Sequence, residues 1–159
     1  MVMIHRGRHL AEIDGDFVVF LIGARFSLLH PLRVYRDLGG RRRGMKAMLD
    51  YLVAHPEKGL LGYTMGLPVI VQYWRSFDHL EAFARDESNQ HVAAWREYYR
   101  RASRHQGAGI WHETYLVRAG EYEAIYANMP TFGLGKAGRL VPAAESSTAR
   151  LRIRARDRL

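Results

Sequence analysis

Residues 109–117 read GIWHETYLV, a run rich in β-branched and aromatic residues that predicts a strand. Side chains alternate along a strand, so His112 and Thr114 share one face while Trp111 and Glu113 share the other. His112 and Glu113 are therefore neighbours in sequence that cannot act as an acid–base pair. An imidazole on a core strand allows two interpretations: a hydrogen-bonded core histidine, or a histidine that lines a pocket and takes part in chemistry.

The segments before this strand supply the rest of a small α+β fold. They are a strand over 16–25, an amphipathic helix over 40–55 that Pro56 ends, two strands of a hairpin within 60–76, and a helix from the N-cap Ser76 to about residue 104. The order strand, helix, strand, strand, helix, strand is typical of the ferredoxin-like split βαβ sandwich. We expect a four-stranded antiparallel sheet with both helices on one face. Because the other face would be bare, we also expect a homodimer.

The length of 159 residues predicts one domain, which we place at 15–136. Residues 1–14 would form an N-terminal arm, and residues 121–128 a short extended arm. The tail over 137–159 carries alternating arginines, glycine, proline and serine with few large apolar residues, so we expect it to be mostly disordered.

Composition excludes several classes of protein. There is no cysteine, which rules out disulfides and thiolate chemistry and fits a reducing cytoplasm. The net charge is +8, but the tail holds half of it, and no nucleic-acid-binding motif accompanies it, so we do not expect nucleic acid as a partner. We recognise no signal peptide and no membrane span, since the longest apolar run, 17–26, is interrupted by Arg25. Motifs of zinc proteases, serine hydrolases and phosphate-binding loops are missing from the sequence.

A second histidine points to the same region as His112. At 100° per residue, His91 falls in the apolar stripe of the predicted helix, with Leu80, Ala84 and Trp95 nearby. Both imidazoles would then face a chamber between helix and sheet. A histidine held through one ring nitrogen can offer the other to an iron atom, while a second histidine can move a proton near neutral pH.

Three stretches carry a resemblance to a known family: VQYWRSFDHLEAFARDESNQHVAAWREYYRR (71–101), GIWHETYLV (109–117) and GEYEAIYANMPTFGLG (120–135). Over about residues 15–136 the chain resembles a monooxygenase-like family of unknown function in the dimeric α+β barrel superfamily. More distantly, it is similar to the antibiotic-biosynthesis monooxygenases and to the haem-dependent aldoxime dehydratases. The last resemblance implies that His91 ligates haem iron, its only metal role, and that His112 is the catalytic acid–base.

Three functions remain open at this point. The first is a haem enzyme, either a monooxygenase or an aldoxime-dehydratase-like lyase, that acts on a small molecule. Its sites would be His91 and Trp95 for the cofactor, His112 for catalysis, and Tyr73, Trp111 and Glu113 for the substrate. The second is a cofactor-free monooxygenase of secondary metabolism, in which His112 deprotonates a phenolic substrate. The third is a non-catalytic small-molecule binding module in which both histidines are structural.

Overall fold

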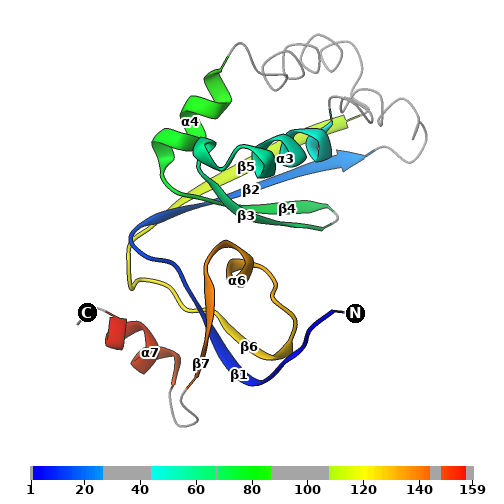
Figure 1. Ribbon diagram of the computed structural model, residues 1–159. Helices are drawn as coiled ribbons and strands as arrows, with labels where there is room; N and C mark the ends of the chain where they lie inside the picture. Colours follow the sequence, from blue (N-terminus) through cyan, green and yellow to red (C-terminus); the bar gives the residue numbers. More distant parts are fainter. Residues whose placement is uncertain (1, 27–43, 67, 87–107, 144–147, 157–159) are drawn as a thin grey trace.

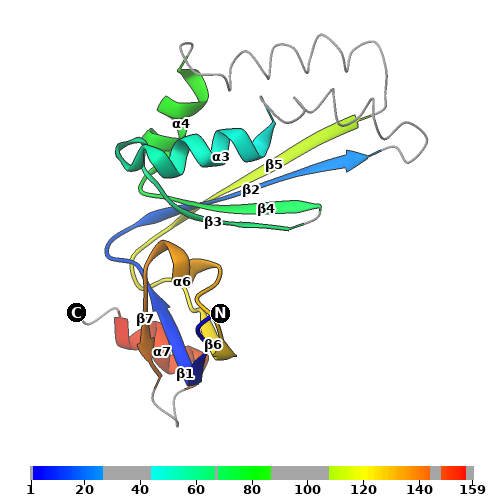
Figure 2. The ribbon, with the colours of Figure 1, turned by 45° about the vertical axis from the view of Figure 1, so that its right-hand side comes forward.

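The computed structural model describes residues 2–26, 44–66, 68–86, 108–143 and 148–156 (Figures 1 and 2). In chain order its elements are β1 (His5–Glu12), β2 (Phe17–Phe26), α3 (Met45–Ala54), a 3-10 turn η1 (Pro56–Lys58), β3 (Leu60–Met65), β4 (Val69–Trp74), α4 (Phe77–Arg85), β5 (Ala108–Val117), β6 (Ile125–Met129), α6 (Leu134–Ala137), β7 (Arg139–Pro142) and α7 (Ala149–Arg156).

The main layer is a four-stranded sheet in the order β3-β4-β2-β5, with every neighbouring pair antiparallel. Helices α3 and α4 lie on one face of this sheet (Figure 1). Because α3 follows β2 and α4 follows β4, the connectivity is that of the split βαβ sandwich. The α+β, ferredoxin-like fold predicted from the sequence is confirmed.

The register of the sheet decides which side chains meet beneath the helices. Central strand β2 places Phe20 opposite Gln72 of β4 and opposite Thr114 of β5. One step along the same face, Ile22 lies opposite His112. Since successive side chains alternate between faces, this whole set points to the helix side.

Helix α4 is shorter than the sequence predicted. Ser76 is its N-cap, as expected, and its hydroxyl accepts a hydrogen bond from the backbone N–H of His79. The helix ends at Arg85, because Asp86 adopts an extended backbone and its carboxylate accepts a hydrogen bond from Lys58 Nζ at 3.2 Å. The prediction of one uninterrupted helix to residue 104 is therefore wrong, because the helix is interrupted at Asp86. Its further part, 87–104, lies outside the described residues.

A second, three-stranded sheet in the order β6-β1-β7 lies on the other side of the main sheet, together with α6 (Figure 2). The predicted N-terminal arm thus contains a paired strand, and the predicted extended arm ends in β6, which pairs with β1. The tail also differs from the predicted disorder, since β7 pairs with β1 and α7 follows it. Apolar packing and charge pairing both hold this segment: Leu140 packs against the second apolar cluster, Arg139 contacts Glu12 and Asp14, and Arg152 of α7 is bonded to Glu123.

The two layers share an apolar cluster that covers part of the face we expected to be bare. Its buried members are Ala11, Ile13, Phe17 and Leu134, and Val19, Tyr73, Val117 and Tyr126 are among the residues packed against it. On the same face β5 still leaves Trp111 and Tyr115 exposed. In the described part of the chain, no helix has the length and apolarity that a bilayer crossing requires.

Candidate active site

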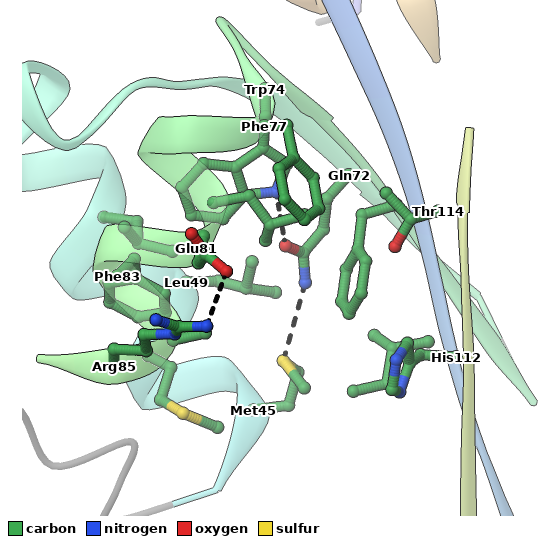
Figure 3. A pocket seen from close by; sticks show the side chains of 16 residues that line it. Met45, Leu49, Gln72, Trp74, Phe77, Glu81, Phe83, Arg85, His112 and Thr114 are labelled. Atoms are coloured by element: carbon green, nitrogen blue, oxygen red, sulfur yellow. Dashed lines mark hydrogen bonds and ion pairs between the residues drawn. The ribbon is translucent and has the colours of Figure 1, made fainter. Parts of the chain in front are cut away.

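A cavity of about 750 Å³ lies between the main sheet and the helices α3 and α4 (Figure 3). The sheet supplies one wall through β2, β4 and β5, and the two helices supply the other. The lining residues are Phe20, Ile22, Met45, Met48, Leu49, Leu52, Gln72, Trp74, Phe77, Leu80, Glu81, Phe83, Ala84, Arg85, His112 and Thr114. Most are apolar or aromatic, and a volume of this size suits a small organic ligand.

His112 reaches the cavity from edge strand β5. Its ring centroid lies 5.4 Å from that of Phe20, with the two rings tilted by 33°. The imidazole is on the exposed side of the cavity, and Thr114 lies two residues further along the same face. This arrangement gives the cavity an imidazole that can accept or donate a proton.

The innermost polar group is the carboxamide of Gln72. Trp74, which has no exposed surface, donates its indole N–H to Gln72 Oε1 at 2.9 Å. The Gln72 Nε2 atom lies 3.8 Å from the sulfur of Met45, on the opposite wall (Figure 3). This polar pair is enclosed by the main core, which includes Leu49 and Leu52.

An ion pair stands at the solvent-exposed end of the cavity. Arg85 Nη2 lies 2.8 Å from Glu81 Oε1, one helical turn apart on α4 (Figure 3). The side chain of Arg85 is largely in water and that of Glu81 is partly exposed, so the pair adds little to folding stability. Both residues line the cavity, so the ion pair forms a polar boundary at this end of a mainly apolar chamber.

Comparison with known proteins finds a family that matches the part of the chain that forms this cavity. The model of the family described as Monooxygenase af470-like matches residues 17–134, about three quarters of the chain. The chain belongs to the monooxygenase af470-like family. The match includes the whole main sheet, both helices and every described lining residue, whereas β1, β7 and α7 lie outside it.

A curated relative is "Monooxygenase af470" of Aspergillus fumigatus, which is 27% identical over 161 residues. The comparison covers 86% of this chain and 56% of the relative, so the chain spans little more than half the length of that protein. The predicted resemblance to a monooxygenase-like family is confirmed. The more distant resemblance to haem-dependent dehydratases stays a prediction.

Within this monooxygenase af470-like chain, three predicted substrate contacts lie on the sheet face away from the cavity. Tyr73 packs in the cluster shared with the second sheet, where burial raises the pKa of its hydroxyl. Trp111 lies over Gly23, close enough that a Cβ there would come within 2.5 Å of the indole. Glu113 accepts a hydrogen bond from the Tyr115 hydroxyl at 2.6 Å. The structure does not bring these residues to His112.

Sequence reasoning missed Phe20, Gln72 and Thr114 as cavity residues. The signal for Gln72 was present, because it is the lone polar residue in the apolar run VIVQYW of β4. Thr114 shares the face of His112 by simple alternation. Phe20 could not be assigned to a site without the register of β2.

The predicted cofactor residues His91 and Trp95 lie outside the described residues. Among the residues that the structure does describe, no three His, Asp or Glu side chains gather where they could hold a metal ion. For haem, the described lining supplies an imidazole at His112 and apolar walls, which is the donor chemistry of a distal haem pocket. The lining thus fits such a group on the His112 side.

Proposed function

We propose that this member of the monooxygenase af470-like family oxygenates a small, largely apolar molecule that carries an ionisable hydroxyl group. The observation that carries the proposal is the position of His112, which lines a cavity of about 750 Å³ whose other walls are mainly apolar. Apolar walls exclude water and hold a hydrophobic ring, and the imidazole supplies the proton transfer that such a ring needs in order to react with oxygen.

The role of His112 follows from its chemistry. A neutral imidazole nitrogen can accept a hydrogen bond from a substrate hydroxyl and take up its proton as the ring reacts. Loss of the proton makes the ring electron-rich. In the reaction that we propose, the substrate loses two hydrogens, one of its ring carbons becomes a carbonyl carbon, and the oxygen of that new carbonyl comes from O₂. The other oxygen atom leaves as water with the two hydrogens, so the substrate supplies the electrons.

Oxygen uptake tests this function. Purified protein is offered hydroxylated anthrone- and naphthalene-type substrates, and ¹⁸O₂ labelling measures whether one oxygen atom enters the product. We expect uptake that His112→Ala lowers by 10²–10⁴-fold in kcat, the range typical of a lost general acid–base group. Turnover of the His112→Ala variant at the wild-type rate would contradict the assignment.

A second candidate is a haem enzyme, in which His91 would hold the iron and His112 would act as the proton donor or acceptor. It is favoured by the described lining, which combines the imidazole of His112 with mainly apolar walls. Haem would supply oxygen activation or, in a dehydratase-like reaction, hold the substrate nitrogen. In that reaction His112 would donate a proton to the departing hydroxyl.

A further inference from the structure

Gln72 stands apart from the other residues of the cavity. Its side chain is only 4% exposed, and among the described residues it is the one polar side chain that is fully buried. It lies on β4 next to central strand β2, with Phe20 as its cross-strand neighbour. Burial of a carboxamide costs free energy unless all its polar groups are hydrogen-bonded. The hydrogen bonds of Gln72 therefore indicate its role.

Trp74 fixes the orientation of this carboxamide. An indole N–H can only donate, and the fully buried indole of Trp74 requires an acceptor. Gln72 Oε1 is that acceptor at 2.9 Å, so the oxygen must face the indole and the NH₂ group must face the cavity. Figure 3 shows the two dashed bonds on opposite sides of the amide.

The NH₂ group of Gln72 can donate more hydrogen bonds than the described residues accept from it. It carries two N–H donors, whereas its partner within the described parts of the chain is the Met45 thioether, at 3.8 Å. Thioether sulfur is a weak acceptor. A buried N–H without a good acceptor costs free energy, and a ligand oxygen placed there recovers it.

We propose that Gln72 is a substrate-binding residue whose Nε2–H group donates to an acceptor oxygen of a flat, oxygenated aromatic ligand. The oxygen is a carbonyl or a phenolate, because the NH₂ group can only donate and Trp74 prevents the amide from turning over. Trp74 is the positioning residue. Its own N–H bond to Oε1 also polarises the amide and strengthens it as a donor.

The register sets where the two polar ends of the ligand lie. Gln72, Phe20 and Thr114 form one row across three strands, and His112 is one step along from Thr114 on β5. Two strand spacings, about 9.6 Å, therefore separate the backbones that carry Gln72 and His112. The Phe20 ring lies between them and beside His112. A planar ligand over Phe20 would place one oxygen at Gln72 and its ionisable hydroxyl at His112.

This inference deepens the proposed function, since it names the substrate class of the same cavity, but it is measured by binding without turnover. The probes are 1,4-naphthoquinone and naphthalene, which have the same shape and differ in the carbonyl oxygens. The chain has no cysteine with which the quinone could react. Calorimetric titration gives the ratio of the two dissociation constants for each variant.

The wild type is expected to bind the quinone more tightly than naphthalene. Gln72→Met should weaken quinone binding by about 5- to 30-fold and change naphthalene binding less than twofold. Thr114→Val is the matched control, because it removes a polar group from the other end of the same row. The proposal would be overturned if Gln72→Met kept the wild-type ratio of the two dissociation constants. It would also be overturned if Thr114→Val, and not Gln72→Met, abolished the preference for the quinone.

If Gln72→Met does not fold, the double variant Gln72→Met with Trp74→Phe takes its place, because removal of both partners leaves no buried N–H unbonded. It carries no amide N–H at this position, so it should also lose the preference for the quinone, and retention would equally overturn the proposal. If the ratio depends on Gln72 while no oxygen is consumed, the proposed function fails and the binding residue stands. If His112→Ala abolishes turnover while Gln72→Met leaves the ratio of the dissociation constants unchanged, only this inference fails.

Discussion

His112 and Glu113 are consecutive residues that lie on opposite faces of the main sheet. His112 lines the cavity beneath the helices, and Glu113 is bonded to Tyr115 on the far face. This makes Glu113 a natural control for His112: a substitution of either residue disturbs the same strand, but only one alters the cavity.

The turnover of matched variants distinguishes the two positions. A glutamine amide cannot accept the substrate proton, so His112→Gln should lower kcat by at least 100-fold. Glu113→Gln should keep kcat close to the wild-type value, because this side chain lies on the far face and is bonded to Tyr115. If both variants bind ligand and neither changes a measurable activity, the non-catalytic binding module is the better account.

The absorption spectrum of protein purified with haem supplied tests the cofactor. The haem hypothesis predicts a Soret band that His91→Ala shifts or abolishes, because the iron would lose its protein ligand. His55→Ala is the control, since His55 lies beyond the end of α3 and contacts Glu57. A protein without a Soret band, or one whose band His91→Ala leaves unchanged, excludes this role of His91.

Leu49 links the stability of the fold to the cavity wall. It is completely buried in the main core, so Leu49→Ala should lower the free energy of unfolding by about 2–5 kcal/mol. Val53→Ala on the same helix alters a side chain that is 62% exposed, and should cost no more than about 0.5 kcal/mol. Urea titration measures both. Equal costs would mean that α3 does not pack on the sheet as described.

Tyr73 should make stability fall at high pH. Burial, and to a lesser degree Tyr126, raises its pKa above the ordinary value of 10.0. The unfolded chain therefore ionises this group first, so its contribution is fully present below pH 10.0 and is lost as the pH rises through the folded pKa. Tyr73→Phe should flatten the decline in melting temperature above that pH. An unchanged decline would contradict the partial burial of Tyr73 between the sheets.

The homodimer remains a prediction that the mass in solution tests. The second sheet covers part of the main sheet, and β5 leaves Trp111 and Tyr115 exposed at 39% and 50%. An open edge strand with exposed aromatic residues favours association. Light scattering should give twice the chain mass of 18.3 kDa, and Tyr115→Ser should weaken the dimer. A monomer at micromolar concentration would contradict it.

Much of the fold was accessible from local patterns, and part of it was not. Apolar periodicity located α3, and runs of β-branched and aromatic residues located β2 and β5, because these signals depend on neighbours a few residues apart. The same patterns suggested disorder for the tail, whose charge pairs with distant residues were invisible. Arg139 meets Glu12, and Arg152 meets Glu123, only after the chain has folded.

The sequence by itself determined that His112 faces away from Glu113, since the two-residue repeat of a strand is a local property of the backbone. Only the tertiary structure decided that Gln72, Phe20 and Thr114 form one row beside His112, and that Tyr73 packs against the second sheet. Strand partners and register arise from contacts between residues far apart in the chain, and a shift of one position would turn every side chain to the opposite face.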